Sequence, residues 1–298
     1  MGNAIKFLFS CVLICCSTAY TAAEVAPCET ITVMSYNIWY TFNRQKQFEA
    51  AGHWLEEADA DVLGLQEVCY ADEATFRQWA KSWGYDYAEI LKPGSMSIAL
   101  CAKKPIAVIK KQTEGMHHGL MLCKIDGIHY LVTHLSPFKY EQRRLETEII
   151  ADMLAPLVEK GEMVVVMGDF NTPSPFDADH VNGNSHLLNA YADTDNRHPD
   201  YVKNLEDGKY EFKAFQTLLD LPLADAGIIP RATSTVDTYP TKAGIPDPEE
   251  RMRQSYRIDF ILLSRNLQER LESFETIIIP ETDSFSDHYP IKAVLKKP

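Results

Sequence analysis

A run of apolar residues leads directly into a short polar motif in the second half of the chain. Residues Val164–Met167 (VVVM) are followed by Gly-Asp-Phe-Asn at residues 168–171. An unbroken apolar, β-branched run is typical of a strand that is buried on both faces. Asp169 and Asn171 lie two residues apart on an extended chain and therefore project to the same side. The sequence predicts a buried strand whose end presents a carboxylate and a carboxamide together.

The same arrangement, an apolar strand with a polar residue at its end, recurs along the chain. The strands predicted at residues 31–36, 61–66 and 128–133 lead to Asn37, Glu67 and His134. Strand ends in α/β proteins often face the binding crevice. A further strand at residues 257–263 carries Asp259, whose charge would be costly to bury without a partner. Taken singly, each of these residues also fits an exposed strand end, a turn or a structural histidine.

The hydrophobic spacing between these motifs predicts a mixed order of helices and strands. Helices are expected over residues 45–58, 71–83, 140–157 and 210–219. Further strands are expected at residues 85–90, 97–102, 106–111, 119–125, 276–279 and 291–295. The combination predicts an α/β fold of two mixed sheets with helices outside. Residues 177–209 are polar and long for a plain connection, which leaves either a functional loop or a disordered segment.

The N-terminus has the pattern of a secretory signal peptide, assigned to residues 1–23. Lys6 precedes an apolar stretch too short to span a bilayer, and small residues follow as far as Ala23. An uncleaved membrane anchor is the alternative. We expect cleavage near Ala23 and export to the periplasm or the cell exterior. Residues 24–298 are expected to form one domain, because no Pro/Ser/Gly-rich linker divides them.

Charge and cysteine content bound the partners and the redox state. The formal net charge is −13, which disfavours passive binding to nucleic acid or anionic lipid, although bound cations can invert the charge of a site. Four cysteines lie beyond the signal: Cys28, Cys69, Cys101 and Cys123. Export permits disulfides, and Cys101 with Cys123 is the favoured pair because both sit in neighbouring predicted strands. Four buried free thiols are the alternative.

Taken together, the polar residues indicate one shared chemistry. Four acids would repel one another if folding gathered them, and a hard divalent cation would relieve that repulsion: Glu67, Asp169, Asp259 and Asp287. Two histidines near such a cation, His134 and His288, could move protons near neutral pH. Metal, histidine and a phosphate-orienting Asn together indicate phosphoester hydrolysis.

Six short motifs occur in order between residues 31 and 295. They are Ser35-Tyr36-Asn37-Ile38, Gln66-Glu67-Val68, Thr133-His134-Leu135, Gly168-Asp169-Phe170-Asn171, Arg257-Ile258-Asp259-Phe260 and Ser286-Asp287-His288-Tyr289-Pro290. This set resembles the endonuclease/exonuclease/phosphatase superfamily, and within it the deoxyribonuclease-like and sphingomyelinase-like branches. The resemblance implies a four-layer α/β/β/α sandwich, with two mixed sheets face to face and helices outside. It also implies a Mg²⁺-dependent phosphoesterase in which Mn²⁺ or Ca²⁺ could serve.

The resemblance further implies a metal site. Its ligands would be Asn37, Glu67, Asp169 and Asp287. Glu67 would be the principal Mg²⁺ ligand, with Asn37 beside it, and Asp287 would support a second metal position.

The same resemblance implies catalytic roles. Asp169 would position or deprotonate the attacking water, and Asn171 would bind the scissile phosphate. Asp259 would hold the tautomer of His288, which would act as general base or phosphate ligand. His134 would match a phosphate-side histidine and be a candidate general acid. Tyr239 would line the cleft.

Two departures from the resemblance bear on the branch. Abasic-site enzymes carry an Asp where this chain has Trp39. Deoxyribonucleases supply a Glu partner for the histidine that His134 matches, and residues 92–97 contain no acid.

The substrate is left open among nucleic acid or nucleotide, a lipid headgroup, and inositol or sugar phosphate. A nucleic acid would need a basic groove, for which the Lys/Arg pairs are residues 103–104, 110–111 and 143–144. A lipid would need exposed apolar side chains such as Trp39 and Phe138. Inositol or sugar phosphates would need a cationic cleft, for which His117-His118, Arg197-His198, Lys203 and Lys209 are available. A monomer without a stable protein partner is expected, and a non-catalytic binding protein on the same scaffold is the alternative function.

Overall fold

The computed structural model describes Met1 and residues 29–229 and 237–298. Apart from Met1, the predicted signal segment therefore lies outside the described residues, as does Cys28. Within the described ranges, none of the helices has the length and apolar character needed to cross a bilayer.

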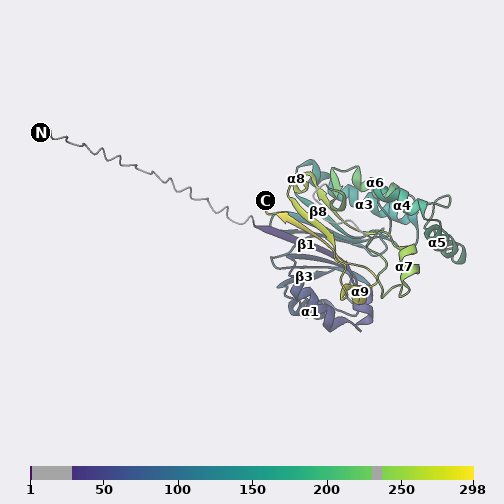
Figure 1. Cartoon of the computed structure of the whole chain (residues 1–298), viewed down its shortest axis with the longest axis horizontal. Helices are drawn as coiled ribbons and strands as arrows, with labels where there is room; N and C mark the ends of the chain where they lie inside the picture. Colours follow the sequence, from purple (N-terminus) through teal and green to yellow (C-terminus); the bar gives the residue numbers. More distant parts are fainter. Residues whose placement is uncertain (2–28, 230–236) are drawn as a thin grey trace.

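Two six-stranded sheets form the centre of the fold (Figure 1). Their strands are β1 (Thr30–Asn37), β2 (Val62–Val68), β3 (Tyr87–Ile90), β4 (Ser97–Ala102), β5 (Ala107–Gln112), β6 (Leu120–Ile125), β7 (Ile128–His134), β8 (Val164–Asp169), β9 (Leu223–Asp225), β10 (Asp259–Ser264), β11 (Leu271–Thr276) and β12 (Ile291–Lys296). The first sheet has the order β11-β12-β1-β2-β4-β3, and the second has the order β5-β6-β7-β8-β10-β9. Both are mixed, because β1 pairs with β2 and β7 with β8 in parallel while the other neighbours are antiparallel.

Helices cover the outer face of each sheet. They are α1 (Phe48–Ala58), α2 (Glu73–Ser82), α3 (Tyr140–Glu159), α4 (Ala178–Gly183), α5 (Ser185–Arg197), α6 (Lys213–Leu219), α7 (Pro248–Gln254), α8 (Arg265–Gln268) and α9 (Thr282–Phe285), with short helical turns at Trp39–Asn43, Pro175–Asp177 and Ala226–Ile228. Buried side chains of α1, α2 and α9 pack on the first sheet, and those of α3 and α6 pack on the second. The predicted α/β/β/α sandwich of two mixed sheets is confirmed.

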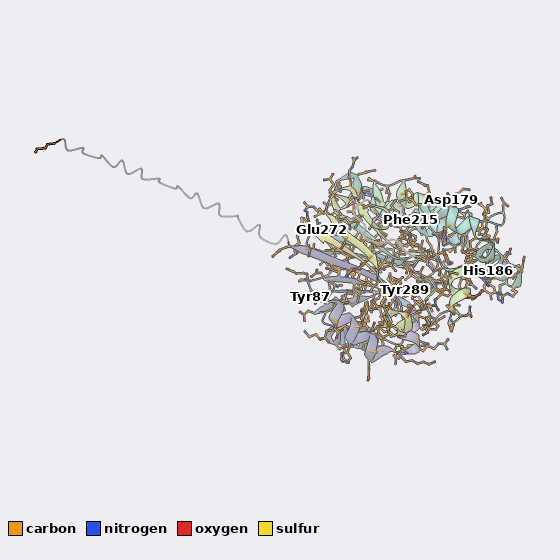
Figure 2. The ribbon with its side chains drawn as sticks, in the orientation of Figure 1. Tyr87, Asp179, His186, Phe215, Glu272 and Tyr289 are labelled. Atoms are coloured by element: carbon orange, nitrogen blue, oxygen red, sulfur yellow. The ribbon has the colours of Figure 1, made fainter. Side chains whose placement is uncertain are left out.

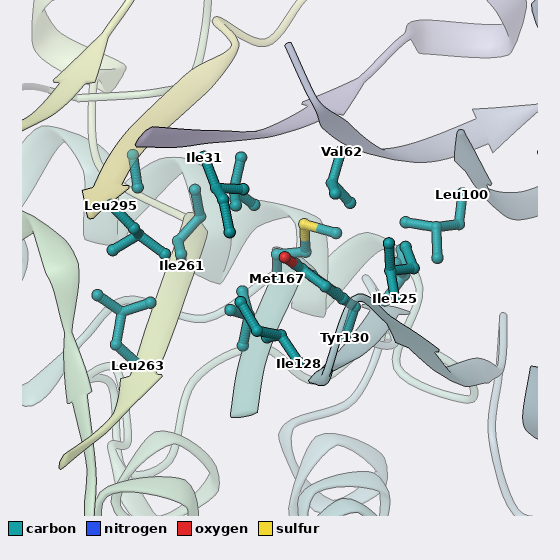
Figure 3. Close-up of a cluster of buried hydrophobic side chains, with 14 of the residues drawn as sticks. Ile31, Val62, Leu100, Ile125, Ile128, Tyr130, Met167, Ile261, Leu263 and Leu295 are labelled. Carbon is teal, nitrogen blue, oxygen red and sulfur yellow. The ribbon is translucent and has the colours of Figure 1, made fainter. Parts of the chain in front are cut away.

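A continuous apolar layer joins the two sheets. Figure 3 shows Ile31, Val62 and Leu100 of the first sheet pointing toward side chains of the second, among them Met167 and Ile261. Burying one such side chain stabilises the fold by roughly 1.5–3 kcal/mol. This layer fixes the sheets face to face, so that the ends of β1, β2, β8 and β10 meet at one edge of the sandwich.

Most of the polar segment at residues 177–209 is helical, so the expectation of a disordered segment was wrong, and the expected loop is confined to residues 198–209. It contains α4 and α5, and the Asn184 side chain caps α5 by accepting from the Leu187 amide at 3.1 Å. Only one side of α5 meets the protein, where Leu187 and Tyr191 pack against a cluster that includes Tyr256. Apart from Leu187, the residues of α5 are exposed or only half-buried, which explains its polar composition.

Two other expectations were wrong. The strand predicted at residues 276–279 lies earlier, at β11, where a bulge between Leu271 and Ser273 interrupts the alternation on which the prediction depended. Cys101 and Cys123 are free rather than paired, because their side chains lie in different layers of the sandwich. Cys101 packs under the helices of the first sheet, whereas Cys123 lies between the sheets.

Candidate active site

The strand register of the second sheet places three of the predicted residues side by side. Asp169 in β8 pairs with His134 of β7 on one side and with Asp259 of β10 on the other. His134 Nε2 lies 3.4 Å from Asp169 Oδ2, and all three side chains are buried. A glycine is needed before Asp169, because a Cβ on Gly168 would lie 1.9 Å from the Thr133 carbonyl oxygen.

Asn37 joins the first sheet to the second. Its Nδ2 atom donates to Asp169 Oδ2 at 2.9 Å and to Glu67 Oε1 at 3.4 Å, and its Oδ1 atom accepts from the Trp39 amide. The second lone pair of Oδ1 remains available to a metal. Glu67 has a φ of 59° and accepts from the Tyr40 amide at 3.0 Å. Strained backbone of this kind, in a non-glycine residue, is concentrated at functional sites.

His288 connects the loop after α9 to both sheets. Its Nδ1 atom lies 2.8 Å from Asp259 Oδ2, and its Nε2 atom lies 3.7 Å from Asp169 Oδ2 and 3.5 Å from Asn37 Nδ2. The loop is held in place by Ser286, which donates to the Asn37 carbonyl at 2.6 Å. The imidazole is thus fixed on one nitrogen by a carboxylate and directs the other into the site.

A buried acidic and histidine cluster is present. Among the described residues, Asp169, Asp259 and His288 form one group whose potential ligand atoms lie within 4.8 Å of one another. Glu67 and Asp287 line the same pocket, and burial, followed by the charge of Asp287, raises the pKa of Glu67. Carboxylate oxygens in this number suit a hard divalent cation, so the donor set fits the predicted metal in kind.

Burial is the main cause of the pKa shifts in the site. It raises the pKa of Asp169 to about 7, against the opposing charge of His288. Burial, together with the neighbouring acids, also raises the pKa of Glu67 and of Asp287. For His288 burial acts to lower the pKa, but Asp259 and Asp169 outweigh it and hold the pKa well above the ordinary value. The residues present therefore leave negative charge unbalanced, which is the electrostatic condition for binding a cation.

A stack of histidines forms one wall of the pocket. His118 stacks on His134 with ring centroids 4.0 Å apart, and His117 meets His118 edge-on at 4.3 Å. Burial and the charge of His118 hold the pKa of His134 well below its ordinary value. Burial of this kind favours the neutral imidazole of His134.

Asn171 and Tyr239 also reach the pocket. Asn171 has a φ of 47°, its amide donates to Asp169 Oδ1 at 2.8 Å, and its side chain donates to the Leu135 carbonyl. The Tyr239 ring lies 4.9 Å from the His288 ring. Sequence reasoning missed Tyr191 of α5, which lines the same pocket. The signal that could have found it is the helical spacing of Leu187 and Tyr191.

The cleft has a volume of about 450 Å³. The basic pairs considered for nucleic acid do not form a groove there: Lys103, Lys111 and Arg144 pair with acids, and Arg143 is buried. Of the cationic set considered for sugar phosphates, His117 and His118 line the cleft, whereas Lys203 pairs with Glu141.

Comparison with known proteins places this geometry in context. The model of the Endonuclease/Exonuclease/phosphatase family matches residues 34–288. Exodeoxyribonuclease III of Haemophilus influenzae is 27% identical over 287 residues, covering 88% of this chain and 99% of the relative. An AP endonuclease from Archaeoglobus fulgidus has a similar structure, with a TM-score of 0.65 and 19% identity over 90% of this chain and all of that one. A 3′-5′ exonuclease from Neisseria meningitidis gives a TM-score of 0.64 and 17% identity over the same shares.

Proposed function

Because the chain belongs to the Endonuclease/Exonuclease/phosphatase family, we propose that it is a divalent-metal-dependent hydrolase of phosphoesters. One observation carries the proposal: polar side chains from separate elements meet at one pocket although they are far apart in sequence. They are Glu67, His134, Asp169, Asn171, Asp287 and His288, with Asn37 and Asp259 directly behind them. The nuclease names of the relatives support the same reaction class.

Glu67, Asp169 and Asp287 are the side chains that would hold the metal. Their unbalanced negative charge and hard oxygen atoms suit Mg²⁺, and Mn²⁺ or Ca²⁺ could take its place. When bound, the ion would supply Lewis-acid stabilisation of charge on the phosphoryl group.

Asp169 and His288 are the groups that would manage protons. Burial raises the pKa of Asp169, so its carboxylate is a stronger proton acceptor for an attacking water than an exposed carboxylate would be. His288, held by Asp259 on Nδ1, presents Nε2 to the same space and can donate a hydrogen bond to a phosphate oxygen. The neutral His134 would hydrogen-bond to the phosphate, with Asn171 on the same side of the pocket.

We propose further that residues 1–23 are a signal peptide and that residues 24–298 act as one exported, monomeric domain. The support for export is the N-terminal sequence pattern. The support for one domain is that no Pro/Ser/Gly-rich linker divides residues 24–298. N-terminal sequencing of the protein recovered from its native host tests the cleavage near Ala23, and size-exclusion chromatography tests the monomer.

The experiment that tests the function is hydrolysis of bis-p-nitrophenyl phosphate and p-nitrophenyl phosphate by the purified chain. Activity should require Mg²⁺, disappear with EDTA and return when Mg²⁺ is added back in excess. A chain that binds phosphoesters with Mg²⁺ but turns over neither compound would instead be a non-catalytic binding protein on the same scaffold.

A further inference from the structure

A second groove, of about 400 Å³, opens beside the catalytic cleft. The two share His117 and Phe138 in their walls, so the groove continues the cleft away from Asp169. Its far side is formed by Tyr201, in the segment that follows α5. Nothing in the proposed reaction uses these residues.

Aromatic rings form an unbroken path from the catalytic centre into this groove. His118 stacks on His134, His117 follows, the Phe138 ring lies 5.1 Å from His117, and Tyr201 lies 6.0 Å from Phe138. Phe138 is 38% exposed and Tyr201 is 52% exposed. Two large rings facing solvent next to a reactive site are available to a ligand rather than to the core.

The positions of the two exposed rings are fixed by backbone contacts. The Phe138 carbonyl accepts from the Lys203 amide at 2.8 Å, and the Tyr140 amide donates to the Lys203 carbonyl at 2.9 Å. The Lys203 side chain also pairs with Glu141. Because these contacts tie the segment that carries Phe138 to the one that carries Tyr201, the groove is already formed without a ligand. Preorganisation of this kind lowers the entropic cost of binding.

The groove also carries positive charge and polar groups. Lys139 donates to the Asp200 carbonyl at 2.9 Å, and no carboxylate within the described ranges pairs with it. Lys92 lies near enough for its charge to lower the pKa of His117, an effect second to that of burial. Gln142 lines the groove as well. A groove wall in which aromatic rings alternate with single cationic side chains suits a planar, hydrogen-bonding group attached to a phosphate. An acyl chain would need a continuous apolar wall.

We infer that this groove, lined by His117, Phe138 and Tyr201, is a subsite in which a nucleobase of the substrate stacks while its phosphate occupies the catalytic cleft. The inference rests on the proposed phosphoester site and names its substrate class as a nucleotide or the end of a short single strand. A long polyanion is disfavoured because the chain carries a net charge of −13 and the basic pairs form no groove. Stacking of a base on aromatic side chains needs no basic groove and tolerates any base.

Calorimetric titration in Mg²⁺ tests the subsite directly. The ligands are thymidine 5′-monophosphate and thymidine 3′-monophosphate, compared with 2-deoxyribose 5-phosphate, which lacks the base, and with glucose 6-phosphate. Chromatography should confirm that each ligand is intact after the titration. One of the thymidine phosphates should bind about 5- to 150-fold more tightly than 2-deoxyribose 5-phosphate, the range expected for one stacked base.

Variants assign that preference to the groove. Phe138→Ala and Tyr201→Ala should each remove most of it, and Phe138→Tyr should keep it. Tyr201, which does not line the catalytic cleft, should be replaceable by Ala without a change in the affinity for 2-deoxyribose 5-phosphate. The matched controls are Phe176→Ala and Tyr87→Ala, which remove exposed rings that do not line the groove. Tyr87 lies on the edge strand β3 of the other sheet. In Figure 2 it lies on the opposite side of the molecule from His186 of α5, the helix that precedes Tyr201. Both controls should keep the full preference.

Several results would overturn the subsite. They are equal affinity for the thymidine phosphates and 2-deoxyribose 5-phosphate, a preference that survives both alanine variants, or tighter binding of glucose 6-phosphate. Hydrolysis of bis-p-nitrophenyl phosphate by the same preparations separates the two proposals. Turnover without a base preference refutes the subsite alone, whereas a groove-dependent base preference without turnover refutes the proposed hydrolase and supports the subsite.

Discussion

The Nδ1 atom of His288 lies 2.8 Å from Oδ2 of Asp259, and neither residue is exposed by more than 4%. This contact joins a loop near the C-terminus to a strand of the second sheet. It fixes the imidazole so that Nε2 faces Asp169. In the proposed proton chemistry, Asp259 would therefore position the imidazole of His288.

Replacing Asp259 by Asn should lower kcat at least about 10²-fold with little change in KM. Asn keeps the shape but removes the charge that holds the His288 tautomer and raises its pKa. Steady-state kinetics on bis-p-nitrophenyl phosphate measures the effect, and the pH–rate profile should shift. An unchanged kcat in a folded variant would show that the contact is only structural.

Glu67→Gln should stabilise the metal-free protein and remove its response to Mg²⁺. Burial and the charge of Asp287 raise the pKa of Glu67, so a neutral amide relieves repulsion. In EDTA the Tm should rise by roughly 2–4 °C, which corresponds to about 1 kcal/mol in a protein of this size. Mg²⁺ should raise the Tm of the wild type alone. At a Mg²⁺ concentration of a hundred times Kd, binding should stabilise the wild type by about 2.7 kcal/mol. If Mg²⁺ raised the Tm of the wild type and of Glu67→Gln equally, Glu67 would not be a metal ligand.

Stability should fall as the pH drops below about 6.5, in part because of His118. Burial and the charge of His117 lower the pKa of His118 in the folded protein to about 3, whereas the ordinary value of 6.5 applies in the unfolded chain. Between these values the unfolded chain binds the proton that the folded chain refuses, so acid favours unfolding by up to about 1.4 kcal/mol per pH unit. Urea unfolding between pH 8 and pH 5 should show a flatter dependence for His118→Asn than for the wild type. Parallel curves would contradict the shift.

Arg257→Met should destabilise the fold by about 3–5 kcal/mol. Arg257 pairs with Asp225 at 2.7 Å and with Asp177 at 3.0 Å, and its loss leaves the fully buried Asp225 charge without a partner. Adding Asp225→Asn should recover part of the loss, whereas the exposed Arg77→Met should be nearly neutral. Urea denaturation of the four proteins measures this, and a small effect of Arg257→Met would show that water reaches Asp225.

The sandwich could be predicted because the apolar pattern within each strand indicates which of its faces are buried. The run Val164–Met167 is apolar on both faces, and the structure buries it on both. The polar residues at the strand ends could also be identified, because each directly follows such an apolar run. That His134, Asp169 and Asp259 are neighbours follows from the register between strands, which no local pattern specifies.

Each failure has a physical cause. The hydrophobic contacts of α5 are confined to one side, so its composition is that of a loop. The bulge in β11 breaks the period-two alternation, and the apolar residues 277–279 that follow drew the prediction away from it. Cys101 and Cys123 lie in strands that follow closely in sequence, yet the chain passes from one sheet to the other between them.

The groove with Phe138 and Tyr201 depends on contacts between segments about 60 residues apart, as in the 62-residue separation of Lys203 and Glu141.

The central claim is that the side chains at the strand ends form one Mg²⁺-dependent hydrolytic site around Asp169. The most direct test is the rate of bis-p-nitrophenyl phosphate hydrolysis in saturating Mg²⁺ for the wild type, Asp169→Ala and the exposed control Asp126→Ala. We predict that Asp169→Ala lowers the rate at least about 10²-fold while the protein stays folded, and that Asp126→Ala matches the wild type. A folded Asp169→Ala protein with near wild-type turnover would contradict the account.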